Sequence, residues 1–160
     1  MSDWLEEGKA MPAFRLEDQD GNVHAKKDLL GKPLVLYFYP RDDTPGCTKQ
    51  ACAIRDRYDE ILETGANLFG VSGDDHESHQ TFRTKFDLPF PLLVDKDNKV
   101  ATKFGAYREK NMYGKVSMGI VRSTFIANAE GKVVKVFRRV KVDTHDEKVL
   151  EVLRELGSEG

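Results

Sequence analysis

Cysteine and tryptophan are scarce in this chain, and neither a strong charge of one sign nor a long apolar run is present. The 160 residues include two cysteines and one tryptophan, and the formal net charge is −2. Such a balance gives no electrostatic case for binding nucleic acid or an anionic membrane. No apolar run approaches the roughly 20 residues that a membrane-spanning helix needs. We therefore expect neither nucleic acid nor a membrane among its partners.

The N-terminus lacks the pattern of a secretory signal. Residues 1–7 are acidic and include no apolar core of the kind that signal peptides have. Two cysteines without such a signal favour a reducing compartment and thiol chemistry over a disulfide scaffold. We expect a cytoplasmic protein, with prior removal of an organellar transit peptide as the alternative. The length predicts one domain spanning residues 1–160.

Alternating strand and helix patterns predict an α/β fold. The expected strands are 13–16, 23–25, 34–39, 66–72, 92–95, 124–127 and 133–138, and the expected helices are 45–63, 99–104, 143–156 and one that starts at Asp74. Glycine-containing turns predict a hairpin towards each end of the chain. The apolar run 34–39 predicts a central strand covered on both faces. This order predicts a central mixed β-sheet flanked by helices, with an N-terminal hairpin.

Both cysteines follow this central strand closely, and Cys47 is expected in the first turn of a helix. The unpaired N–H groups and the dipole at a helix start favour the negatively charged thiolate, which is the reactive form of cysteine. The polar turn that contains Cys47 favours a nucleophile over the alternative, a small buried hydrophobe. A cation would favour the thiolate further. The segment supplies none, because Asp42 and Asp43 outweigh Arg41.

Cys52 is the candidate partner of Cys47. Residues five apart in a helix are separated by ~8–9 Å at Cα and point to different faces, whereas a disulfide tolerates at most about 7 Å. The two sulfurs can therefore bond only if the first turns of the helix unwind, which would make oxidation a conformational switch. The alternative is a core position for Cys52, since free cysteine is among the most buried residue types.

Two further residues of the segment are candidates for the same site. Thr44 has a hydroxyl that can both donate and accept, so it could hold a thiolate and a polar substrate together. An ordinary N-cap is the alternative for Thr44, and the two roles are compatible. Pro40 fixes the chain as it leaves the strand and could shield the sulfur, although turn formation alone explains it equally well.

The segment resembles the active site of a known family. Pro40-x-x-x-Thr44-x-x-Cys47 is similar to the peroxiredoxin signature, and residues 36–47 together with Cys52 resemble the bacterioferritin-comigratory (Q-type) subfamily. Similar segments continue in order over roughly residues 8–156. The resemblance implies a thioredoxin-like fold and the reduction of hydroperoxides without a metal or an organic cofactor.

The resemblance also implies a role for each site residue. Cys47 matches the peroxidatic cysteine, Cys52 the resolving cysteine, Thr44 the hydroxyl that bonds sulfur and peroxide, Pro40 the shield of the pocket, and Arg122 the cation beside the thiolate. Spacing alone does not single out Arg122. The implied reaction converts Cys47 to a sulfenic acid, which Cys52 condenses with, and thioredoxin or a similar dithiol reduces the disulfide. The expected assembly is a monomer or a weak dimer.

Two rival functions remain open. A thioredoxin-like disulfide reductase is disfavoured because four residues separate the cysteines, whereas such enzymes use Cys-x-x-Cys. A peroxide-sensing redox switch would use the same cysteines without turnover. His76 and His79 have a spacing that could suit a metal, but an exposed polar helix start is the favoured interpretation. The acidic pair in the cysteine segment is interpreted as turn residues.

Overall fold

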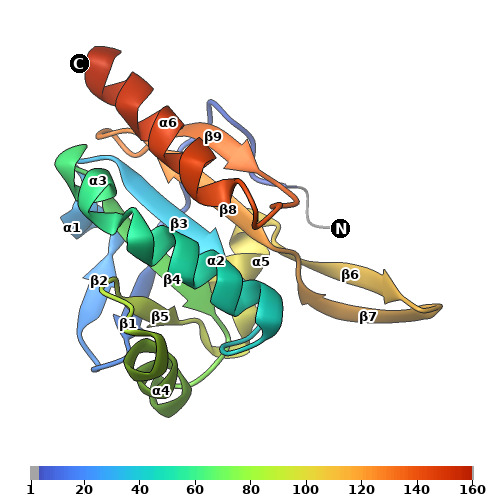
Figure 1. Ribbon diagram of the computed structural model, residues 1–160. Helices are drawn as coiled ribbons and strands as arrows, with labels where there is room; N and C mark the ends of the chain where they lie inside the picture. The colour runs from blue at the N-terminus through green and yellow to red at the C-terminus, as the bar shows by residue number, and fades with distance from the viewer. Residues whose placement is uncertain (1–3, 160) are drawn as a thin grey trace.

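A seven-stranded mixed sheet forms the centre of the molecule (Figure 1). The structure is a computed structural model that describes residues 4–159. The strands are, in spatial order, β2 (Val23–Ala25), β1 (Arg15–Asp18), β5 (Leu92–Val94), β4 (Asn67–Ser72), β3 (Leu34–Phe38), β8 (Ser123–Ala127) and β9 (Val133–Phe137). β3, β4 and β5 are parallel, whereas β8 is antiparallel to β3. The predicted mixed sheet and the N-terminal hairpin of β1 and β2 are confirmed.

Helices cover both faces of this sheet. They are α1 (Lys26–Leu29), α2 (Pro45–Asp56), α3 (Tyr58–Glu63), α4 (His76–Phe86), α5 (Lys99–Phe104) and α6 (His145–Glu159), with a 3-10 turn at Lys96–Asn98. In Figure 1, α2 and α6 cross the front of the sheet and α5 lies behind it. None of the helices between residues 4 and 159 combines the length and the apolar character that a membrane crossing requires.

β3 divides the core into two apolar clusters. All five of its residues are buried, and they alternate between the two faces of the sheet. Val35 and Tyr37 pack with α2, α3, α4 and α6 in a cluster that includes Cys47. Leu36 and Phe38 pack on the other face with α5 and the N-terminal segment. The central strand predicted from the uniform apolar run is therefore confirmed.

Two helix boundaries differ from the prediction. The helix expected over 45–63 is interrupted at Arg57, whose φ of −110° and ψ of 6° are not helical, so α2 and α3 are separate. α4 begins at His76, and its N-cap is Asp75, whose carboxylate accepts a hydrogen bond from the Ser78 N–H at 2.9 Å. Asp74 therefore does not cap this helix and is free for other contacts.

The sequence patterns do not predict a second sheet of two strands. β6 (Tyr107–Met112) and β7 (Lys115–Ile120) pair antiparallel and project from the body of the molecule (Figure 1). β6 is mostly polar and shows no apolar alternation, whereas β7 has Val116, Met118 and Ile120 at alternate positions. Tyr113 and Gly114 at the turn have φ of 55° and 80°, and two positive φ values favour a type I′ turn, in which tyrosine is unusual. The hairpin thus has a partial sequence signal in β7 and Gly114, and its unusual parts are the polar strand β6 and Tyr113.

Candidate active site

Strand pairing brings two distant segments together at one end of β3. β8 is antiparallel to β3, with Ser123 opposite Phe38. The residues just after β3 and the residues just before β8 therefore lie close together, at the same end of these two neighbouring strands. The first group is the loop 39–44, which leads into α2, and the second includes Arg122. The fold thus carries Arg122 to the start of α2.

Arg122 lies against the first turn of α2. A Cβ on Gly46 would lie only 3.0 Å from Arg122 Nη2, so the absence of a side chain at Gly46 lets the guanidinium approach the backbone next to Cys47. Arg122 Nη1 also donates to Gln50 Oε1 at 2.7 Å, about one helical turn further on. The structure therefore places a cation beside the first turn, where the local sequence offers none.

Cys47 occupies that first turn and is 2% exposed. It packs in the core cluster with Ala51 and Ile54, which lie on the same face of α2. The N–H groups of the first turn have no intrahelical partner, and the positive end of the helix dipole lies here. Two sources of positive potential, the helix start and Arg122, therefore lie beside the first turn that contains Cys47.

Cys52 lies on α2 and is half-buried, away from that core cluster. Both cysteines are free thiols. Because α2 is continuous from Pro45 to Asp56, helix geometry keeps the two sulfurs too far apart to bond. The structure shows the helical arrangement that has to open before a disulfide can form between Cys47 and Cys52.

Thr44 takes the N-cap position of α2 without capping it. Its φ of −98° and ψ of 155° are extended, and its side chain makes no bond to the first-turn N–H groups. Thr44 Oγ1 instead donates to the Arg41 carbonyl oxygen at 3.1 Å, which leaves its lone pairs available to an incoming donor. Pro40 is exposed at the beginning of the loop. The fold thus collects Thr44, Cys47 and Arg122 at the start of α2 and leaves Pro40 on the surface.

A chain of hydrogen bonds that the sequence interpretation missed holds Arg122 in place. Gln50, which accepts from Arg122, donates from Nε2 to His145 Nδ1 at 3.3 Å, and His145 Nε2 donates to Thr124 Oγ1 at 2.7 Å. Burial lowers the pKa of His145 to about 4, so its ring is neutral at pH 7 and has one donor nitrogen. The amide oxygen of Gln50 is therefore fixed towards Arg122.

Gln50 and Lys110, which the sequence interpretation also missed, differ in how they could have been found. Gln50 lies three residues after Cys47, a spacing that puts two side chains on one side of a helix, so the sequence held that signal. Lys110, on β6, is placed only by the tertiary fold. Burial lowers the pKa of Lys110, the positive charge of Arg122 lowers it further, and negative charge at Cys47 opposes both effects. The β6–β7 hairpin therefore contributes a second cation to the surroundings of the site.

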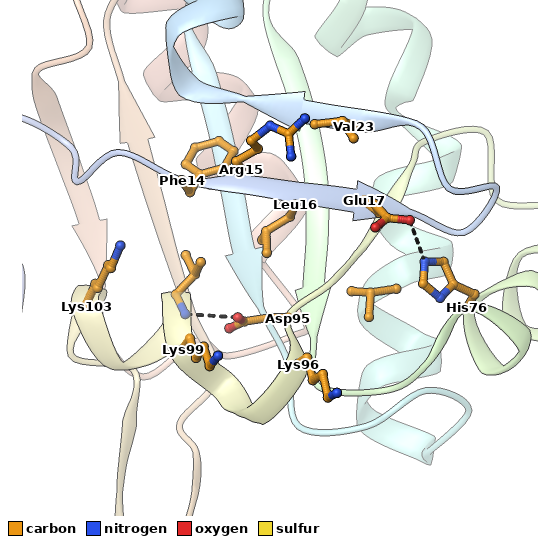
Figure 2. Close-up of a pocket in the computed structure, with 12 residues that line it drawn as sticks. Phe14, Arg15, Leu16, Glu17, Val23, His76, Asp95, Lys96, Lys99 and Lys103 are labelled. Atoms are coloured by element: carbon orange, nitrogen blue, oxygen red, sulfur yellow. Dashed lines mark hydrogen bonds and ion pairs between the residues drawn. The ribbon is translucent and has the colours of Figure 1, made fainter.

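The cleft drawn in Figure 2 is separate from this site. It encloses about 510 Å³ beside β1, β5 and α5. Phe14 and Leu16 contribute apolar surface, and Lys96, Lys99 and Lys103 lie around it. None of the five residues predicted for the active site lines this cleft. The cleft is therefore separate from the residues that the sequence predicts for the active site.

The sequence matches the model of the AhpC/TSA family over residues 8–136. The chain belongs to this family. A peroxiredoxin Bcp of Bacillus subtilis is 42% identical to it over 95% of this chain and 97% of the relative. Peroxiredoxin Q of Xanthomonas campestris superposes with a TM-score of 0.86 at 40% identity, covering 90% of this chain and 91% of the other. A bacterioferritin comigratory protein of the same organism, described for its alkyl peroxide reduction activity, gives 0.87 at 36% identity over 98% and 99%.

These relatives confirm the family resemblance and the thioredoxin-like fold. They also confirm the function class, because members named peroxiredoxin are thiol-dependent peroxidases. The chain is an enzyme of this class, which acts on peroxides with electrons from a thiol reductant. A non-catalytic module is thereby disfavoured.

Proposed function

We propose that Cys47 is the peroxidatic cysteine of this peroxidase and that hydrogen peroxide and organic hydroperoxides are its substrates. The observation that carries the assignment is the meeting of Cys47, Thr44 and Arg122 at the start of α2, where the helix dipole adds positive potential. The relative described for alkyl peroxide reduction supports organic hydroperoxides as substrates. Pro40, at the surface of the same loop, limits access from the solvent side.

In the first step, the Cys47 thiolate attacks the terminal oxygen of the hydroperoxide. An S–O bond forms and the O–O bond breaks, so Cys47 becomes a sulfenic acid and the leaving oxygen takes up a proton to depart as water or alcohol. Thr44 accepts the hydrogen bond of the peroxide. Arg122 and the free N–H groups of α2 stabilise the charge that develops on the oxygens, and one such donor contributes about 2.7–4 kcal/mol in comparable sites.

In the second step, Cys52 resolves the sulfenic acid. Its thiolate attacks the Cys47 sulfur, an S–S bond forms, and the hydroxyl group leaves as water after taking a proton. This step needs the first turns of α2 to unwind. Thioredoxin or a similar dithiol then reduces the disulfide by thiol–disulfide exchange. We place this cycle in the cytoplasm, in a single-domain protein that works as a monomer or weak dimer without metal or organic cofactor.

A coupled assay tests the cycle. With thioredoxin, thioredoxin reductase and NADPH, we expect NADPH loss that depends on hydrogen peroxide and that Cys47→Ser abolishes. Cys52→Ser should consume about one equivalent of peroxide and then stop with a sulfenic acid at Cys47. Absence of peroxide-dependent turnover with every dithiol donor would contradict the proposal, and insulin reduction alone would favour a disulfide reductase. Normal turnover by Cys52→Ser would make Cys52 a structural residue.

A further inference from the structure

The loop between β3 and α2 contains one acidic residue that points inward. Asp42 is 8% exposed, whereas Arg41 and Asp43 on either side of it are exposed. Burying a carboxylate is unfavourable unless hydrogen bonds and an opposite charge compensate it. The interpretation of Asp42 as a turn residue accounts for its place in the chain but not for its burial.

Four hydrogen bonds fix Asp42. Tyr39 donates its hydroxyl to Oδ1 at 2.6 Å, the Ser78 hydroxyl donates to Oδ2 at 2.8 Å, and His79 Nδ1 lies 2.6 Å from the same oxygen. The main-chain N–H of Asp42 donates to Asp74 Oδ2 at 2.8 Å. Three of the four partners belong to α4 or to the residues just before it. The loop that leads to the active site is therefore tied to α4.

The neighbours of His79 determine its protonation. The residue is 0% exposed, so the exposed helix start expected for it is wrong. Nε2 lies 2.9 Å from the Leu93 carbonyl oxygen, which can only accept, so Nε2 carries a proton. Nδ1 faces the Asp42 carboxylate, which already accepts from two hydroxyl groups, so Nδ1 donates as well. Both ring nitrogens of His79 are therefore held by oxygen atoms, and the short Nδ1–Oδ2 distance leaves no room for a metal ion between His79 and Asp42.

Asp43 connects this ion pair to Thr44 through a strained backbone. Its φ is 55°, a left-handed conformation that is uncommon and less stable for residues with a side chain, although Asp adopts it more readily than most. The Asp43 carboxylate itself forms an ion pair with Lys85 of α4 at 2.7 Å. Release of Asp42 would let Asp43 relax to a common conformation and would move Thr44, the next residue.

We propose that the buried ion pair of His79 and Asp42 positions Thr44 for the peroxide, an inference that rests on the proposed function of Cys47. Neither residue touches the substrate, and both act through the loop. α2 itself is held separately, because Arg122 contacts its first turn and Gln50. Breaking the ion pair therefore misplaces the Thr44 hydroxyl while the thiolate keeps its positive surroundings.

The variant His79→Asn tests this inference, with His76→Asn as its matched control. His76 lies one turn earlier on α4, and its ring is partly exposed and 3.3 Å from Glu17. Two reactions of Cys47 are followed in each variant: oxidation by hydrogen peroxide, and alkylation by iodoacetamide, which needs the thiolate but not Thr44. We expect His79→Asn to lower the peroxide rate constant by about 100-fold, the scale of a reacting group misplaced by about 1 Å, and to leave alkylation unchanged. His76→Asn should change neither rate.

A second variant carries the test if His79→Asn does not fold. Ser78→Ala removes one donor to Asp42 and so loosens the carboxylate that pairs with His79. The peroxide rate constant should fall by about 10-fold, the scale of one hydrogen bond to a charged group. A wild-type peroxide rate in a folded variant, or equal losses of peroxide and iodoacetamide reactivity, would overturn the positioning role. A wild-type protein whose Cys47 fails to react with peroxide would instead refute the proposed function.

Discussion

Two neighbouring tyrosines differ in whether their hydroxyl groups have partners. Tyr37 and Tyr39 are each 1% exposed, and their rings lie 5.5 Å apart. The Tyr39 hydroxyl donates to Asp42 at 2.6 Å. The Tyr37 hydroxyl has no hydrogen-bond partner within residues 4–159, and burial, followed by negative charge at Cys47, raises its pKa well above the ordinary value. The pair allows the effect of an unpaired buried hydroxyl to be measured against a paired one.

Tyr37→Phe is expected to stabilise the reduced protein. Leaving a buried hydroxyl unpaired costs about 1–3 kcal/mol relative to its hydrated state. The Tyr37 hydroxyl oxygen lies close to Gly70, because a Cβ placed on Gly70 would be only 2.9 Å from it. Removing this oxygen therefore opens a small gap beside Gly70, and a gap of methyl size costs about 1 kcal/mol. The net gain in the free energy of unfolding is therefore about 1 kcal/mol, which raises Tm by about 2–4 °C in a chain of this size.

Urea unfolding of the reduced protein, followed by circular dichroism, measures this difference. The matched variant Tyr39→Phe loses a hydrogen bond to a charged group and should lower the free energy of unfolding by about 1.5–3 kcal/mol. Opposite signs for the two variants are the expected result. A loss above about 1 kcal/mol in Tyr37→Phe would refute the reasoning, because it would show that the Tyr37 hydroxyl is paired in solution, for example by a buried water.

Three further outcomes are expected. Gln50→Leu removes the acceptor that orients Arg122 and should lower the stopped-flow rate constant with hydrogen peroxide by about 10-fold, the effect of one hydrogen bond to a charged group; an unchanged rate would show that Arg122 needs no such support. Because the pKa of His145 falls from 6.5 to about 4 on folding, the unfolded chain alone takes up this proton as the pH drops through that window. The free energy of unfolding should therefore fall by up to about 3 kcal/mol between those pH values, less so in His145→Gln. In the disulfide form, hydrogen exchange should show the Thr48 amide exposed and the Asp42 amide still protected; exposure at Asp42 would mean that unwinding reaches the loop.

Much of the fold could be predicted because its signals are local. The helix expected over 99–104 is α5, and it ends at Gly105 with a φ of 81°, a conformation that selects glycine. The break between α2 and α3 has no such signal. Arg57 at the break forms ion pairs with Asp146 at 2.7 Å and Glu147 at 3.3 Å, both on α6. A boundary that coincides with contacts to a distant helix could not be read from the residues around it.

The residues of the candidate site also divide into those that a local sequence pattern reveals and those that only the tertiary fold brings together. Thr44 and Cys47 lie within one turn of each other, so a local pattern places them together. Arg122 arrives through the pairing of β3 with β8, and only the family resemblance singled it out. His79 shows the reverse error: its polar neighbours predicted an exposed helix start, whereas the acidic partner that justifies its burial lies in another loop. Buried polar networks are assembled by tertiary structure, which is why spacing alone could not reveal this one.

In the proposed cycle, the start of α2 meets two opposing requirements with the same features. Its first turn includes Gly46, which disfavours a helix by about 1 kcal/mol relative to alanine, and Thr44 leaves the first N–H groups uncapped. Those free N–H groups are the ones that can stabilise charge on a peroxide. The same lack of capping lowers the cost of unwinding the turn, which the proposed attack of Cys52 on Cys47 requires. Because Asp42 anchors the preceding loop, unwinding is directed along α2 towards Cys52. A better-capped helix would therefore weaken both steps, since it would occupy the peroxide's donors and hold the two sulfurs apart.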